Sequence, residues 1–176
     1  FEGWQRGPAL PQSDGKPRRT VQAAVETALS RLLGETIEVV GAGRTDAGVH
    51  AEGQAASFHS RTALEPGAIV AGLAPLLPAD LRCVSCREVD PRFHARYRAK
   101  GKLYRYRLHV GTLSDPLLRP TSLYVGPGLD LGAMRRAAAL LEGSHDFGAF
   151  TNAKGKGDTV RRLDSARVET SGDIVD

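Results

Sequence analysis

Three stretches of the chain carry apolar residues at every third or fourth position, which predicts three amphipathic helices. The first follows Thr20, a residue type suited to an N-cap, and stops at Gly34. The second spans Pro66–Leu77, with proline in its first turn and Pro78 just beyond its end. The third spans Leu129–Gly143, and its predicted apolar face consists of Leu131, Met134, Ala138 and Leu141.

Shorter apolar segments between and after these helices predict strands. They are Thr36–Val40, Gly53–Ser60, Leu81–Val89, Arg96–Val110 (one long strand or a strand pair), residues 160–170 and Asp173–Val175. This order predicts an α+β fold, with a mixed or antiparallel β-sheet and helices packed on one face.

We expect a single domain over residues 1–176. Residues 7–19 are rich in proline, glycine and charge, which predicts a flexible loop. Both ends read as unfinished, because no strand precedes "FEGWQR" and "SGDIVD" stops within a predicted strand. We therefore expect a fold that is incomplete at both termini.

Positive charge is concentrated in one part of the chain, the basic segment Arg92–Arg107. It holds seven of the 24 Lys and Arg residues and no acid, while 20 Asp and Glu outnumber the remaining cations. Such a stripe is typical of a polyanion partner, most often nucleic acid. A solvated strand face that discourages edge pairing remains the alternative.

The chain shows no membrane span, since its longest apolar stretch, around Ala63–Leu77, is short and interrupted by Glu, Gly and Pro. We expect a soluble, cytoplasmic protein without a membrane partner. Cys83 and Cys86 form one isolated C-x-x-C. With no second pair nearby, we expect reduced structural thiols rather than a zinc site. Trp4 is expected in the core.

The densest cluster of unusual residues is "GAGRTDAGVHA", residues 41–51, which we name the RTD loop. A dinucleotide fingerprint would need a third glycine where Asp46 stands, and a P-loop would need a Lys and Ser/Thr that are absent. A nucleotide-binding enzyme is thus a weaker alternative. Asp46, His50 and His59 lack metal-ligand spacing, so we expect no metal.

Ser144, His145 and Asp146 are contiguous and do not form a triad, because adjacent side chains point apart. We expect Ser144 or Asp146 to support a turn or cap instead.

Arg44 and Asp46 are two residues apart, so in extended backbone they project to the same side. An ion pair between them would keep Asp46 ionised. Gly43 and Gly48 would permit a sharp bend or the close approach of a substrate. An ordinary surface ion pair is the alternative interpretation.

The RTD loop closely resembles the signature loop of the tRNA pseudouridine synthase A family. Further matching motifs follow the family's order along nearly the whole chain. They are "GWQR" (3–6), "TVQ" (20–22), "GQAASF" (53–58), "FHAR" (93–96), "YRYR" (104–107) and "GSHDFGAF" (143–150).

The resemblance implies a pseudouridine synthase fold and isomerisation of uridine to pseudouridine in the anticodon stem-loop of tRNA. It implies Asp46 as catalytic nucleophile, with Arg44 pairing with it and helping to hold the flipped nucleotide. It implies no cofactor and a homodimer whose partner is the anticodon arm of tRNA. A non-catalytic RNA-binding domain that uses the basic segment is the second hypothesis.

The resemblance also assigns Tyr104 to substrate binding, by stacking on the uracil. In a continuous strand Tyr104 would share a face with Lys102, and the basic positions change face near Gly101. A bulge there is predicted to turn Tyr104 toward Asp46. Further candidate RNA contacts are His50, Arg96, Arg98, Lys100 and Lys102.

Overall fold

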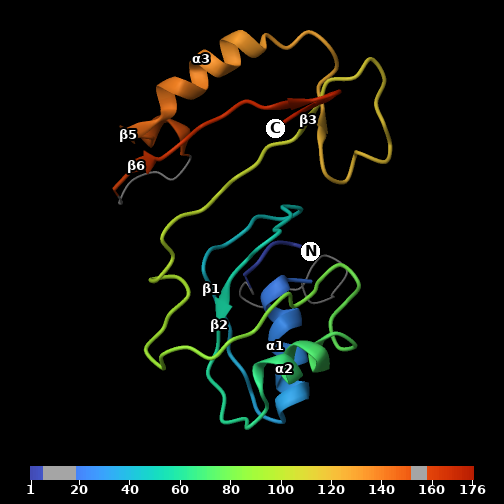
Figure 1. The fold of residues 1–176 in the computed structure, drawn as a ribbon, viewed down its shortest axis with the longest axis vertical. Coiled ribbons are helices and arrows are strands. Elements are labelled where there is room, and N and C mark those ends of the chain that lie inside the picture. The colour runs from blue at the N-terminus through green and yellow to red at the C-terminus, as the bar shows by residue number, and fades with distance from the viewer. Residues whose placement is uncertain (6–18, 152–157) are drawn as a thin grey trace, which may run out of the picture. The chain divides into compact units, whose positions relative to one another are not determined.

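The computed structural model describes residues 1–5, 19–151 and 158–176 (Figure 1). Within them the chain forms two compact units, Phe1–Lys102 and Leu103–Asp176. Each unit has its own helices and strands. Nearly all of the predicted flexible loop, residues 7–19, lies outside the described residues.

The first predicted helix is confirmed as α1, Val21–Leu33. The Thr20 hydroxyl accepts a hydrogen bond from the Ala23 amide at 3.3 Å, as an N-cap does. Gly34 ends the helix at φ +70°, and its amide donates to the Ser30 carbonyl at 3.0 Å. This left-handed C-cap is the conformation that glycine adopts without steric cost.

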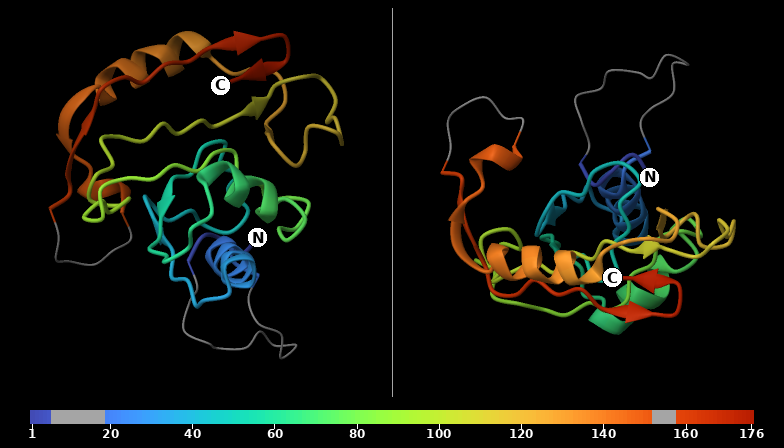
Figure 2. Two further views of the ribbon diagram at one scale, coloured as in Figure 1. Left: turned by 60° about the horizontal axis from the view of Figure 1, so that its bottom comes forward. Right: turned by 90° about the horizontal axis from the view of Figure 1, so that it is seen from above.

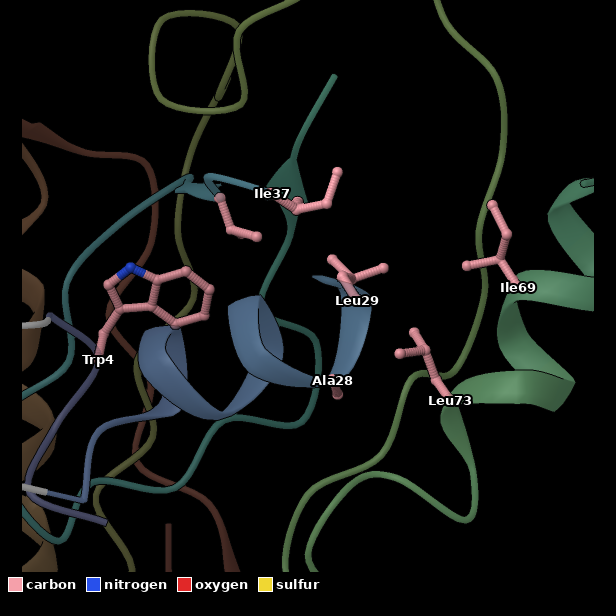
Figure 3. Close-up of a cluster of buried hydrophobic side chains, with 7 residues drawn as sticks. Trp4, Ala28, Leu29, Ile37, Ile69 and Leu73 are labelled. Atoms are coloured by element: carbon pink, nitrogen blue, oxygen red, sulfur yellow. The ribbon is translucent and has the colours of Figure 1, made fainter. Parts of the chain in front are cut away.

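The second helix, α2, spans Pro66–Leu73 and packs on α1. Figure 3 shows Leu29 of α1 pointing toward Ile69 and Leu73 of α2. The helix ends earlier than the predicted Leu77, because Pro75 has no amide to continue the ladder. Residues 74–77 continue as turns.

The predicted strand at Thr36–Val40 is largely an extended segment that lies along α1. It buries Ile37 and Val39 alternately, as predicted for a strand. The Ile37 amide donates to Ser30 Oγ at 2.9 Å and the Val39 amide to Glu26 Oε1 at 3.1 Å. Because side chains of α1 accept hydrogen bonds from these amides, pairing with another strand is confined to the C-terminal end of the segment.

That pairing joins β1 (Val40–Gly41) and β2 (Ala56–Ser57) in antiparallel register, with Gly41 opposite Ala56. The strands are therefore far shorter than the predicted Thr36–Val40 and Gly53–Ser60. They nevertheless fix the two ends of the RTD loop.

The core of the first unit confirms Trp4 as a buried residue. Its indole is 7% exposed and lies against Gly41, where an added Cβ would come within 2.5 Å of indole Cζ2. The other buried members are Ala28, Leu29, Ile37, Val39, Ile69 and Leu73 (Figure 3).

The strand predicted at Leu81–Val89 is wrong, because this segment has no regular structure. Cys83 and Cys86 both pack against the core. A spacing of three residues cannot place two side chains on one face of a strand, whose period is two. Both thiols are free and half-buried, and burial raises the pKa of the Cys83 thiol.

The long strand predicted at Arg96–Val110 is also wrong. The Arg98 amide donates to the His94 carbonyl at 3.0 Å in a helical turn, and only Leu108–His109 forms a strand, β3. In its first half the alternating positions Arg96, Arg98, Lys100 and Lys102 are all charged, so that face has nothing apolar to bury in a sheet. Gly101 lies in irregular backbone, so the expected bulge in a continuous strand is absent.

In the second unit β3 lies at the centre of a small mixed sheet. The order is β4 (Leu123–Tyr124), β3, β8 (Ile174–Val175) and β7 (Thr170–Ser171), with β3 and β4 parallel and the other pairs antiparallel. The strand predicted over residues 160–170 divides into β6 (Val160–Leu163) and β7.

The third predicted helix is confirmed as α3, Leu131–Leu141, whose Asp130 carboxylate caps the Ala133 amide at 2.8 Å. Leu131, Met134 and Ala138 are half-buried, and Leu141 is exposed. Figure 2 shows the C-terminal segment running alongside α3, where Arg135 donates to the Val168 carbonyl at 3.3 Å.

Asp146 supports a turn, as predicted. It ends β5 (Gly143–Asp146), which pairs with β6, and precedes the 3-10 helix η1 (Gly148–Phe150). Its carboxylate accepts hydrogen bonds from the Thr159 hydroxyl and the Gly148 amide, and these bonds lower the pKa of Asp146.

The described residues thus form a mixed α/β structure with three α-helices and three small sheets. Among the helices of these residues, none has both the length and the apolar character needed to cross a membrane.

The contact between Trp4 and Gly41 predicts the effect of a small substitution. Gly41→Ala should displace the indole and destabilise the protein by about 1–3 kcal/mol, the usual cost of overpacking. Trp4 is the single tryptophan, so its fluorescence should shift to the red while urea unfolding reports the stability. Gly53→Ala, where an added Cβ meets nothing within 4 Å, is the matched control. Equal stability of the two variants would contradict the prediction.

Candidate functional site

The RTD loop is closed at its base by contacts between its first residues and residues 54–55, which follow it. The Ala42 amide donates to the Ala55 carbonyl at 2.8 Å. One step further out, the Gln54 side-chain amide donates to the Gly43 carbonyl at 2.7 Å. These bonds continue the β1–β2 pairing and hold the chain close to the point where Arg44 leaves it.

The N-terminal segment supports the loop from its other side. The Trp4 amide donates to the Thr45 carbonyl at 3.0 Å, and the Gly48 amide donates to the Phe1 carbonyl at 3.2 Å. Gly3 has φ +90°, and a Cβ there would lie 2.6 Å from the Thr45 oxygen. Glycine is therefore required at this position by both the conformation and the close approach.

Asp46 begins a tight turn at the tip of the loop. The Val49 amide donates to the Asp46 carbonyl at 3.2 Å, and Gly48 has φ +78° at the third position. A positive φ at that position is the requirement of a type II turn. The turn leaves the Asp46 side chain exposed to solvent.

The predicted ion pair between Arg44 and Asp46 is not formed. Both side chains are exposed, and among the described residues neither has an ion-pair partner within 4.0 Å. An exposed pair gains about 0–1 kcal/mol in water, which is too little to fix two flexible side chains. The backbone alone therefore positions the Asp46 carboxylate.

An open cationic basin of about 670 Å³ lies beside the loop. It is formed by two segments of the first unit, residues 42–44 of the loop and part of the basic segment. Its lining residues are Ala42, Gly43, Arg44, Arg96, Ala99, Lys100, Gly101 and Lys102.

The structure thus brings together four of the predicted site residues, Arg44, Arg96, Lys100 and Lys102. Arg98 and His50 are exposed and do not line the basin. Tyr104 is 71% exposed and belongs to the second unit, so its placement against Asp46 remains a prediction.

The described residues support neither metal binding nor a nucleophilic thiol at Cys83. They contain no cluster of three or more His, Cys, Asp or Glu side chains that could hold a metal ion. The raised pKa of Cys83 keeps that thiol protonated near neutral pH, which makes it a poor nucleophile.

Two residues that shape the loop, Gly3 and Gln54, are missing from the predicted site. Each lies in a short motif that already carried the resemblance, "GWQR" and "GQAASF". Their roles depend on contacts with Thr45 and Gly43, which neither spacing nor periodicity could indicate.

The hydrogen bond from the Gln54 side chain to the Gly43 carbonyl predicts how a substitution would change the dynamics of the loop. Gln54→Leu removes the donor to the Gly43 carbonyl, a loss of about 0.5–1.5 kcal/mol. Amide hydrogen exchange between residues 42 and 49 should accelerate, by up to about tenfold. Amides of α1 serve as the internal control. Equal acceleration in α1 would show global destabilisation and contradict the prediction.

Comparison with known proteins identifies relatives of this chain. A family model described as tRNA pseudouridine synthase matches residues 7–98. A protein of Bacillus cereus named tRNA pseudouridine synthase A 2 is 41% identical over 156 residues, which are 89% of this chain and 61% of that relative.

Two proteins named tRNA pseudouridine synthase A are also similar. One from Neisseria meningitidis serogroup B is 44% identical over 154 residues, 88% of this chain and 56% of the relative. One from Acetivibrio thermocellus is 38% identical over 176 residues, 99% of this chain and 69% of the relative. The chain spans about three-fifths of the length of most of these relatives. On the family match and these identities, the chain belongs to the tRNA pseudouridine synthase family.

Proposed function

We propose that the protein isomerises uridine to pseudouridine in tRNA, with Asp46 as the catalytic nucleophile. The observation that carries the proposal is a backbone-anchored loop that presents an exposed carboxylate next to a basin lined by four cations. Membership of the family supports the reaction, and the names of the relatives support tRNA as the substrate.

The reaction suits a single carboxylate. The bond between ribose C1′ and uracil N1 breaks, and a bond between C1′ and uracil C5 replaces it. C5 loses its proton to solvent, and N1 gains one. The atoms and electrons balance without an oxidant or reductant, so the proposed reaction needs no cofactor. Covalent catalysis by Asp46 would divide one difficult substitution into easier steps.

Access to the target base requires that the nucleotide leave the helical stack, at a cost of a few kcal/mol. Arg44 is two residues from Asp46, is exposed and lacks an ion-pair partner among the described residues, so its guanidinium is free to hold the flipped nucleotide. Tyr104 is proposed to stack on the uracil. Such stacking contributes about 1–3 kcal/mol per base.

The finer parts of the proposal follow from the family resemblance. The target uridines lie in the anticodon stem-loop, and the working enzyme is a cytoplasmic homodimer whose two subunits contact the tRNA. In it, both units of the chain belong to one catalytic domain, with one sheet and helices on a single face. The exposed candidates His50 and Arg98 would contact RNA outside the basin.

A second candidate function is RNA binding without catalysis. It is favoured by one observation, the gathering of unpaired cations at the basin. Unlike the proposed isomerase activity, RNA binding alone assigns no role to the Asp46 carboxylate.

Tritium release distinguishes the two candidates. The full-length protein is incubated with tRNA that carries tritium at uridine C5, because pseudouridine formation expels that label. Asp46→Asn should abolish release while tRNA binding persists, since the change removes a nucleophile from an exposed position without altering the side chain's size.

Arg87→Met, an exposed substitution away from the loop and the basin, is the control and should release tritium like the parent. Equal release by parent and Asp46→Asn would remove Asp46 from the reaction. Salt-sensitive binding without release from either protein would establish the second candidate.

A further inference from the structure

The three glycines of the RTD loop occupy positions where three different physical constraints disfavour a larger residue. Gly48 has φ +78°, which the turn at Asp46 requires. Gly41 makes room for the Trp4 indole. Gly43 has no positive φ, so conformational freedom does not explain it.

The space above Gly43 is occupied by the side chain of Lys102. A Cβ added to Gly43 would lie 2.6 Å from Lys102 Nζ and 2.9 Å from Lys102 Cε. These distances are far inside van der Waals contact. The lysine side chain therefore crosses the loop directly over Gly43, next to Arg44.

The Lys102 ammonium is held there without a carboxylate. Within the described part of the chain, Lys102, Arg44, Arg96 and Lys100 have no ion-pair partner, and no acid lines the basin they share. Elsewhere in the same unit, Arg19 pairs with Asp80 and Arg92 with Asp90 at 3.0 Å. Unlike Arg19 and Arg92, the four cations of the basin have no such partner among the described residues.

We infer that Gly43 and Lys102 form a steric pair that holds the lysine ammonium as a phosphate contact for the RNA substrate. Gly43 leaves the space in which the lysine side chain lies, and the Lys102 ammonium is the group that binds the ligand. The inference rests on the proposed function for its ligand, an RNA phosphodiester. It assigns a role to this glycine other than cradling phosphate with its own backbone amide.

A phosphodiester fits the geometry better than a planar carboxylate does. A phosphate group presents several oxygens in different directions, and the basin offers cations from two separate chain segments. Lysine acts as a point charge that tolerates variation in the angle of approach. A phosphate between Lys102 and Arg44 would also relieve the repulsion between the two cations.

The test is a double-substitution cycle on binding of an anticodon stem-loop RNA by the full-length protein. Lys102→Met should weaken binding roughly tenfold, the loss of one charge-assisted contact. It should also reduce the salt dependence of log K by about 0.7–0.9, the value for one phosphate contact. Lys102→Arg keeps the charge and should keep the salt dependence.

Gly43→Ala should weaken binding in the parent and have no further effect in the Lys102→Met background, because its methyl group acts only by displacing the lysine. The atoms it meets are the far end of a flexible side chain, so the fold should persist, with Trp4 fluorescence as the check. Arg87→Met, which removes one exposed charge away from the basin, is the control and should bind nearly as the parent does.

Two results would overturn the inference. One is parental affinity and salt dependence for Lys102→Met. The other is an equal loss on Gly43→Ala whether or not Lys102 is present. Tritium release measured on the same preparations separates the two proposals, since absence of release from the parent would remove the isomerase activity and leave the binding cycle interpretable.

Discussion

The packing of the Trp4 indole against Gly41 is the contact on which the first unit depends. The same residue donates its amide to Thr45 in the RTD loop and accepts at its carbonyl from the Gln22 amide in the first turn of α1. Core, helix and loop therefore meet at one residue. A loop that would otherwise be a flexible hairpin connection is thereby tied to the buried core of the unit.

This anchoring explains how Asp46 can be held in place while its side chain stays in water. Backbone bonds from Ala42, Gly48 and Trp4 fix the loop, and none of them uses the side chains of Arg44 or Asp46. In water an ion pair between those two would add little. The loop therefore presents Arg44 and Asp46 independently, and neither side chain depends on the other for its place.

The sequence predicted the helices well because their signals are local. Thr20 and Gly34 act on the ends of their own helix, as predicted, whereas Asp130, predicted to lie inside the third helix, is its N-cap. Strands depend on partners elsewhere, and here the partners differ from those a sheet would supply. Side chains of α1 accept hydrogen bonds from the backbone amides of the segment before β1, and the alternating positions Arg96–Lys102 are charged and offer no apolar face. The same reason applies to the site. Arg44 and Asp46 are recognisable within one short motif, whereas the role of Gln54 depends on a contact with Gly43, eleven residues away.

The charges of the first unit point to an external partner. Four cations around one basin repel one another, and stability alone would favour pairing them as Arg19 and Asp80 are paired. Moving a carboxylate into the basin would relieve this repulsion and also compete with any polyanion for the same cations. Under the proposed function, the RNA phosphate backbone would offset this excess positive charge. In that proposal the basin and the exposed Asp46 carboxylate have complementary roles, because the cations would attract an RNA backbone that the carboxylate alone would repel.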